Sequence, residues 1–195
     1  MLFRRSLLIF GILISNLALG QKPFEHQFEV FSGFLPLQGI LPEIYLSEAD
    51  LESNFALEGA SQAGFSYGFE YGYFLSPGVA LTIHVNYTPF QGEFLNSTST
   101  NLSYLDQQHL AVMMGTQFYY LRTDRSFQLY SSILLGGMGI DQFIRDDLGE
   151  RRNQIGVVAF QVSPIGLRFG SRFGGSLEIG IGHKGVFSAG LFYRL

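Results

Sequence analysis

The sequence predicts an all-β protein, built as a closed antiparallel up-and-down barrel of about eight strands that crosses a membrane. Apolar and polar residues alternate in repeated short segments, as they do on strands whose two faces meet different surroundings. Hydrophobic residues make up 47% of the chain and charged residues only 14%, whereas a soluble domain has about 25% charged residues. Short and long connections alternate between the segments, and this asymmetry is typical of transmembrane barrels.

The first 20 residues have the features of a secretory signal peptide. A short positive region at the N-terminus is followed by an apolar run over residues 6–19, and the small residues Ala18 and Gly20 precede the expected cleavage point. We therefore assign residues 1–20 to a cleaved signal peptide and residues 21–195 to a single barrel domain. A retained N-terminal anchor helix is the alternative.

Three alternating segments open the predicted barrel. The first covers residues 24–34, where apolar residues lie opposite glutamates. Residues 62–75 alternate most regularly, with seven apolar or aromatic residues on one face and polar residues or glycines on the other. Residues 79–88 continue the pattern after a tight turn at 76–78, so the two segments together predict a hairpin.

Three further segments occupy the second half of the chain. Residues 108–121 and 126–139 alternate and are separated by the polar turn 122–125. Residues 154–170 contain two alternating sets of opposite parity, and Pro164 stands where the parity changes. A β-bulge at Ser163-Pro164 would return both sets to one face of the sheet.

The last predicted hairpin comprises residues 175–182 and 186–195, joined at His183-Lys184-Gly185. Each strand is expected to have about the 9–11 residues that a tilted membrane strand requires. Short connections on one side and long polar connections on the other predict a barrel with short periplasmic turns and longer outer loops. The long connections are residues 36–61, 90–106 and 141–153.

The composition limits how the fold is stabilised and which partners it can have. The chain contains no cysteine, so closure of the sheet must replace disulfide bonds. It contains no tryptophan, so its 20 phenylalanines and 10 tyrosines must supply any belt at the membrane interfaces. Lysine and arginine are absent between Lys22 and Arg122, and no basic stripe is present, so we expect no nucleic-acid partner.

The last eight residues form an alternating strand that ends flush with the chain. Their pattern resembles the C-terminal targeting signal of bacterial outer-membrane barrels, although that family usually ends in Phe. Over residues 21–195 the chain resembles small eight-stranded outer-membrane barrels such as OmpX and the transmembrane domain of OmpA. The stretches 163–170 and 178–185 are similar to barrel domains common in Bacteroidetes. The residues that match the targeting signal are Ser188, Gly190, Tyr193 and Leu195.

This resemblance implies a porin-like fold in the outer membrane of a Gram-negative cell. It implies contact with outer-membrane lipid and lipopolysaccharide, and assembly by periplasmic chaperones and the barrel-assembly machinery. Members of the family are mostly structural or adhesive. We therefore expect a structural or surface-interaction role and a monomeric protein.

Eight strands enclose a lumen that side chains can fill. The inward parity carries charged residues, and buried charges need partners. We expect Arg168 to meet Glu178 and Arg194 to meet Glu25, which would leave no open pore; since many inward residues are glycines, a narrow channel for small solutes is the alternative. The predicted lumen network comprises Glu25, Glu29, Glu70, His84, His109, Arg168, Glu178 and Arg194.

The sequence contains no pattern that predicts catalysis, and we expect no cofactor or bound metal. None of the four histidines lies in the His-x-Ser arrangement of the deacylase barrels, yet a lipid A-modifying enzyme stays open as an alternative. His84 and His109, with Glu70 nearby, leave an acid–base or metal site open as well. Two further alternatives are a soluble lipid-binding calyx and a divalent cation site among the acidic residues of loop 36–61.

Overall fold

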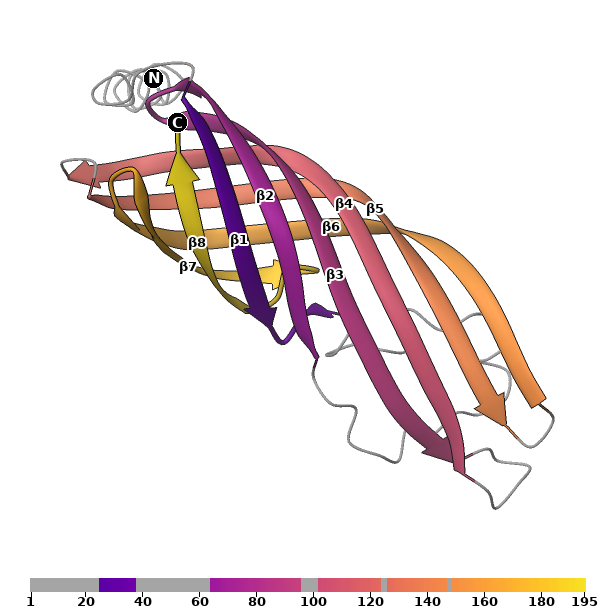
Figure 1. The fold of residues 1–195 in the computed structure, drawn as a ribbon. Coiled ribbons are helices and arrows are strands. Elements are labelled where there is room, and N and C mark those ends of the chain that lie inside the picture. The colour runs from indigo at the N-terminus through magenta and orange to yellow at the C-terminus, as the bar shows by residue number, and fades with distance from the viewer. Residues whose placement is uncertain (1–24, 38–63, 96–101, 124–125, 147–148) are drawn as a thin grey trace, which may run out of the picture.

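The computed structural model describes residues 25–37, 64–95, 102–123, 126–146 and 149–195. Eight strands pair in chain order and β1 also pairs with β8, so the sheet closes into a barrel (Figure 1). Every neighbouring pair is antiparallel, so the predicted closed up-and-down barrel is confirmed. The strands are β1 (His26–Phe34), β2 (Phe65–Ser76), β3 (Val79–Leu95), β4 (Leu102–Thr123), β5 (Phe127–Asp146), β6 (Gly149–Gly170), β7 (Phe173–Gly182) and β8 (Phe187–Arg194).

Two predicted features lie outside the described residues. They are the signal peptide at 1–20 and nearly all of the first loop at 36–61, including its acidic residues. Within the described ranges, no helix is long and apolar enough to cross a bilayer.

The register of the strands puts alternate residues inside and outside the barrel. Glu29 of β1 lies opposite Glu70 of β2 and Phe192 of β8, and all three side chains are buried. The next residue, Val30, lies opposite Phe69, and both side chains are exposed on the outer face. Because the side chains of a strand alternate in direction, this one relationship repeats around the closed sheet.

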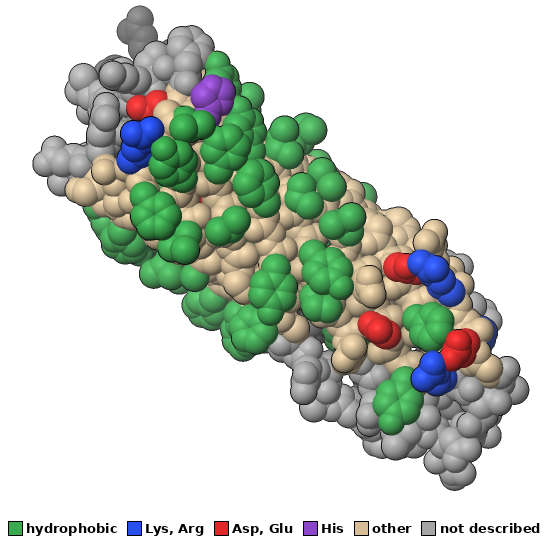
Figure 2. Space-filling view, viewed as in Figure 1, with side chains coloured by type: hydrophobic (Ala, Val, Ile, Leu, Met, Phe, Trp, Pro, Cys, Tyr) green, Lys and Arg blue, Asp and Glu red, His purple; other side chains and the backbone are tan. Residues whose placement is uncertain are grey.

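The outer face carries a broad belt of hydrophobic side chains. Figure 2 shows them spread over the middle of the molecule, with charged side chains toward its ends. In water this exposed apolar surface would be far larger than a soluble monomer tolerates, so the belt is suited to contact with lipid. Its exposed members include Val30, Phe69, Leu81, Ile83, Val85, Leu110, Val112, Met114, Ile133, Leu135, Val158, Val162, Ile165, Leu177, Ile179, Ile181, Phe187 and Leu191.

The two ends of the barrel differ. One end, which we call the turn end, holds the turn at Pro77-Gly78, the bend at Ser171-Arg172 and the C-terminal residue Leu195 (Figure 1). The opposite end, the loop end, holds the connection between β7 and β8 and the far ends of β3 to β6. Tyrosines such as Tyr120 and Tyr193 lie exposed on the outer face near the turn end.

Four strands are longer than predicted. β3 to β6 contain 17, 22, 20 and 22 residues, about twice what a membrane crossing needs, so the predicted loops 90–106 and 141–153 are mostly strand. These segments are polar because their outward residues, such as Gln91 and Arg145, lie beyond the hydrophobic belt. Polarity alone therefore gave the wrong boundary: alternation continues, but water replaces lipid outside the sheet. We call residues 88–95, 102–109, 140–146 and 149–155 the protruding sheet; Figure 1 shows it extending beyond the other strands.

The predicted β-bulge in β6 is confirmed. The pairing of β6 with β7 shifts between Val162 and Ile165, and the pairing with β5 shifts opposite the same segment. As a result Val162 and Ile165, which have opposite parity in the sequence, are both exposed on the outer face. Proline suits the extra position because it has no backbone N–H to leave unpaired.

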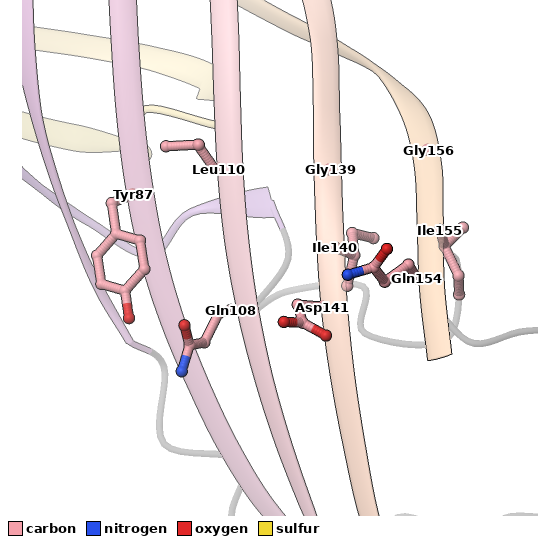
Figure 3. Close-up of a pocket in the computed structure, with 9 residues that line it drawn as sticks. All are labelled: Tyr87, Gln108, Leu110, Gly139, Ile140, Asp141, Gln154, Ile155 and Gly156. Atoms are coloured by element: carbon pink, nitrogen blue, oxygen red, sulfur yellow. The ribbon is translucent and has the colours of Figure 1, made fainter. Parts of the chain in front are cut away.

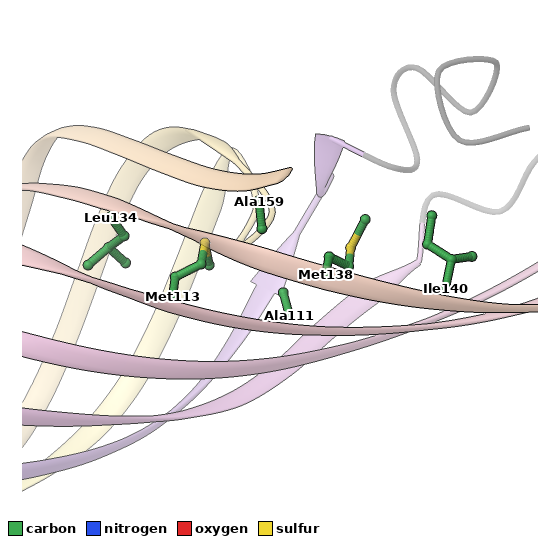
Figure 4. Close-up of a cluster of buried hydrophobic side chains, with 6 residues drawn as sticks. All are labelled: Ala111, Met113, Leu134, Met138, Ile140 and Ala159. Atoms are coloured by element: carbon green, nitrogen blue, oxygen red, sulfur yellow. The ribbon is translucent and has the colours of Figure 1, made fainter. Parts of the chain in front are cut away.

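Apolar residues also pack inside the barrel, toward the loop end. Leu134, Met138 and Ile140 of β5 contact residues of β4 and β6 (Figure 4). A second cluster, Phe90 with Leu105 and Ile144, lies on the inner face of the protruding sheet. The inward face is therefore not uniformly polar. The cluster drawn in Figure 4 comprises Ala111, Met113, Leu134, Met138, Ile140 and Ala159.

Candidate functional site

Arg168 is the centre of a buried ion cluster that crosses the lumen. Its Nη2 lies 2.7 Å from Glu29 Oε2 of β1 and 3.1 Å from Glu70 Oε1 of β2. Its Nη1 donates to Gln117 Oε1 of β4 at 2.9 Å and also to the Tyr119 hydroxyl. The Arg168 side chain is 0% exposed, so one guanidinium from β6 links three other strands inside the barrel.

Lys184 supplies a second buried cation. Its Nζ lies 2.7 Å from Glu178 Oε2 and 3.7 Å from Glu70 Oε2. Lys184 belongs to the connection between β7 and β8 and is 1% exposed, so this connection folds inward over the lumen. Sequence reasoning placed it in a brief loop and missed it, because a lysine flanked by turn residues normally faces water.

The backbone at Lys184 fits against Gly33 of β1. A Cβ atom on Gly33 would lie 1.7 Å from the Lys184 carbonyl oxygen, so only glycine allows this approach. Ser66 donates its hydroxyl hydrogen to the same carbonyl, and Gln161 accepts a hydrogen bond from the Lys184 amide at 3.0 Å. Gly185, with a φ of 125°, supplies the turn that returns the chain to β8.

The predicted pair of Arg168 with Glu178 is wrong. Arg168 lies opposite Ser176, and Glu178 lies opposite Gly166, so the two side chains occupy different levels of the β6–β7 ladder. Glu178 instead binds Lys184 and accepts hydrogen bonds from Tyr130 at 3.0 Å and Ser132 at 3.1 Å. The sequence favours an ion-pair partner on a neighbouring strand, but the lumen is narrow enough for the arginine side chain to reach across it.

Arg194 lies in the lumen near the turn end. It donates to Gln27 Oε1 at 2.9 Å and to Gln128 Oε1 at 2.5 Å, and its guanidinium carbon lies 4.6 Å from the Phe192 ring centre. Glu25, its expected partner, precedes β1 and is only half-buried. Side-chain amides and aromatic rings therefore fill the lumen beside Arg194.

The two lumen histidines are buried but lie at different levels. His84 Nδ1 is 3.6 Å from Glu70 Oε2, and its ring stacks on Phe31 with centres 4.6 Å apart. His109 contacts Gln107 Oε1 at 3.0 Å. His84 lies opposite Met113, four residues from His109 on β4, which separates them by about 13 Å. Among the described residues, no group of three or more His, Cys, Asp or Glu side chains is arranged to hold a metal ion.

Aromatic rings close the lumen around Arg168. Its guanidinium carbon lies 4.5 Å from the Tyr130 ring centre and 5.7 Å from that of Tyr119. Phe74 packs on Tyr119 nearer the turn end, with ring centres 5.3 Å apart. These rings stand on the polar parity of their strands, so alternation alone indicates inward positions but not how fully they fill the tube.

The residues of the expected targeting signal divide between the two faces of β8. Ser188 is buried, whereas Tyr193 and Leu195 are exposed on the outer face. A Cβ on Gly190 would lie 2.7 Å from both Glu29 Oε1 and Ser176 Oγ, which are joined by a 2.6 Å hydrogen bond. Gly190 therefore leaves space for the hydrogen bond between Ser176 and Glu29 in the lumen.

The protruding sheet carries exposed ion pairs on its outer face. Arg145 Nη2 lies 2.5 Å from Glu150, and Arg152 Nη2 lies 2.5 Å from Asp141. The hydrogen bond from Arg152 lowers the pKa of Asp141 below its usual value. Because these pairs are exposed and screened by water, they contribute little to stability.

A groove of about 530 Å³ lies on the outer face where the hydrophobic belt gives way to the protruding sheet (Figure 3). Tyr87 and Leu110 line its apolar side, and Asp141 and Gln154 line its polar side. Gly139 lies between them, and a Cβ there would meet no atom within 4 Å. The groove thus arises because two glycines, Gly139 and Gly156, interrupt the outward side chains.

Two edges of the protruding sheet have no paired strand among the described residues. The pairing of β2 with β3 ends at Tyr87, and the pairing of β6 with β7 begins at Gln161. Within the described part of the chain, no strand pairs with the outer edge of residues 88–95 or 149–159. Such edges present backbone donors and acceptors that another extended chain can pair with.

Comparison with solved structures shows the same fold elsewhere. The chain is similar to Ail, the attachment invasion locus protein of Yersinia pestis, with a TM-score of 0.54, 14% identity, and coverage of 89% of this chain and 100% of Ail. It is similar to Ail in complex with the heparin analogue sucrose octasulfate, with a TM-score of 0.53, 15% identity and the same coverage. No family model and no curated protein sequence matches the chain. The chain therefore has the fold of the small eight-stranded outer-membrane β-barrels.

Proposed function

We propose that the protein is a non-enzymatic outer-membrane barrel that presents its protruding sheet to molecules outside the cell. The observation that carries this proposal is the change of polarity along β3 to β6. Outward residues are apolar across the belt and mostly polar beyond it, with the aromatic residues Tyr104 and Phe143 exposed among them, while the inner face stays partly apolar. The parts of these strands that continue into water do not span the membrane, so their surface is available for contact.

The unpaired edges favour a partner that adds a strand. An extended peptide can pair with the backbone of residues 149–159, and alternate side chains then supply specificity. Glu150 and Arg152 on this strand are charged, which limits uncontrolled association of copies through the edge. We therefore propose an extended polypeptide segment as the partner class.

A polyanionic partner is less well supported. Ail has been solved with a heparin analogue, sucrose octasulfate. In this chain the exposed arginines Arg145 and Arg152 are each paired with a carboxylate. That pairing reduces the positive potential a sulfated glycan would need.

We also propose that the barrel-assembly machinery recognises the C-terminal end of β8, at the turn end, during assembly. Tyr193 and Leu195 are exposed on the outer face, where a partner can reach them. Leu195→Asp should leave the protein in the periplasm, where chaperones hold it and proteases degrade it. Membrane insertion of this variant at the wild-type level would contradict the assembly role.

The absence of cysteine from the sequence allows a sharp test of the surface location. Arg145→Cys places a thiol on the protruding sheet, and Ser171→Cys places one at the turn end; both positions are exposed. In intact cells a membrane-impermeant maleimide should label only the first variant, and permeabilised cells should show labelling of both. Labelling of Ser171→Cys alone in intact cells would reverse the proposed orientation and remove the proposed function.

A further inference from the structure

One place in the hydrophobic belt combines polar groups with a groove. On the outer face near the turn end, His26 of β1 lies beside Tyr71 and Tyr73 of β2. His26 Nδ1 is 2.7 Å from the Tyr71 hydroxyl oxygen, and the His26 ring centre lies 5.9 Å from that of Tyr71 and 5.3 Å from that of Tyr73. Figure 2 shows a histidine among hydrophobic side chains on this part of the surface.

The hydrogen bond to Tyr71 determines which ring nitrogen of His26 carries the hydrogen. If Nδ1 accepts the Tyr71 hydroxyl hydrogen, the neutral ring carries its own hydrogen on Nε2. Nε2 has no hydrogen-bond partner among the described residues. A polar N–H on a surface that faces hydrocarbon and its interface is costly unless it meets an acceptor.

The adjacent groove has a volume of about 610 Å³ and crosses β2, β3 and β4. Its walls belong to two neighbouring rows of the ladder, one containing Tyr71, Ile83 and Met114 and the other Tyr73, Leu81 and Thr116. Thr116 is the smallest of these outward residues, and it opens the end of the groove between larger neighbours. Two strand spacings separate β2 from β4 and give the groove a length of about 10 Å.

The register extends both rows to β1, where His26 lies opposite Tyr73 and Phe28 lies opposite Tyr71. The polar pair therefore stands at one end of an apolar trough. Arg172, which is exposed, adds a positive charge to the same end of the barrel and lies over the Tyr193 ring at 5.4 Å. An anionic group beside hydrocarbon complements this combination.

We propose that this groove binds one diacyl glycerophospholipid of the leaflet at the turn end. An acyl chain fills the trough along Leu81, Ile83 and Thr116, and the phosphodiester accepts a hydrogen bond from His26 Nε2. Tyr71 is a positioning residue that holds the imidazole in this orientation. The proposal rests on the transmembrane barrel fold and is independent of any partner of the protruding sheet.

Native mass spectrometry of the folded protein, released from detergent micelles after incubation with dioleoyl-phosphatidylglycerol, tests the proposal. The control ligand is dioleoylglycerol, which has the same chains and lacks the phosphate. We expect one retained phospholipid per chain and at least about fivefold less retention of dioleoylglycerol, as befits a hydrogen bond to a charged group. Equal retention of the two lipids by the wild-type protein would overturn the proposal without any variant.

Variants then locate the site. His26→Ala and Thr116→Phe, which fills the trough, should each lower phospholipid retention about fivefold, and Tyr71→Phe should lower it about threefold. Tyr120→Phe, a tyrosine on the outer face at the same end, is the matched control and should retain phospholipid as the wild type does. Wild-type retention by His26→Ala, or equal losses in all four variants, would overturn the assignment; migration on an unheated gel confirms that each variant is folded.

Discussion

The Lys184 ammonium lies 2.7 Å from the Glu178 carboxylate inside the barrel, although the two residues are only six positions apart across the last hairpin. Both side chains are buried. The connection between β7 and β8 therefore supplies a cation to the lumen instead of forming an outer loop. Lys184 and Arg168 are two buried cations that lie among the carboxylates of Glu29, Glu70 and Glu178. His84 lies beside the Glu70 carboxylate.

Removal of the Lys184 charge should destabilise the barrel strongly. Lys184→Met leaves Glu178 buried without its cation, and such a loss costs about 3–5 kcal/mol. Urea titration of the protein in lipid vesicles, followed by the folded fraction on unheated gels, measures this effect. The double variant Lys184→Met/Glu178→Gln should recover part of the loss, because it removes the uncompensated charge; a double variant less stable than Lys184→Met would contradict the pairing.

The packed lumen should not conduct ions. Arg168, Tyr119 and Tyr130 are buried and fill the tube at one level, so the wild-type protein in planar bilayers should give no stable single-channel current. The double variant Arg168→Ala/Tyr130→Ala should open a water path and produce measurable conductance. A large, steady conductance of the wild-type protein would show that the lumen is open and would favour the channel alternative.

Two glycine substitutions should separate close packing from strand propensity. Gly33→Ala forces a Cβ onto the Lys184 carbonyl oxygen, whereas Gly139→Ala projects into open space on the outer face. We expect Gly33→Ala to lose about 1–3 kcal/mol of unfolding free energy, as overpacked sites do, and Gly139→Ala to lose little or nothing. Urea midpoints in vesicles compare the two; equal midpoints would mean that the connection at Lys184 does not pack against β1 as described.

The β-bulge in β6 accommodates one extra residue without changing the faces of the strand. Deletion of Pro164 would leave Val162 and Ile165 two positions apart, so both stay on the outer face and Arg168 stays in the lumen. The deletion variant should therefore still give a heat-modifiable, folded band. Pro164→Ala keeps the residue count and should fold as well, since position 164 is exposed and lies at the shift in pairing; loss of the folded band in the deletion variant would contradict this account.

Much of this architecture follows from the sequence because it depends on local patterns. Alternation with a period of two identifies all eight strands, and the change of parity at Pro164 identifies the bulge. The same parity places Glu29, Glu70, His84 and Arg168 on the inward face. These are one-dimensional signals: a strand's side chains must alternate, whatever its neighbours are.

Only the tertiary structure decides which inward groups meet and where the sheet leaves the membrane. The partners of Arg168 come from β1 and β2, because closure of the barrel brings distant strands within reach of one side chain. The burial of Lys184 depends on the space that Gly33 leaves on another strand. The protruding sheet has the same alternation as the belt, but most of its outward residues are polar because they meet water. Closure of the barrel and the exposure of each face to lipid or water depend on the whole molecule, so no local stretch of sequence determines them.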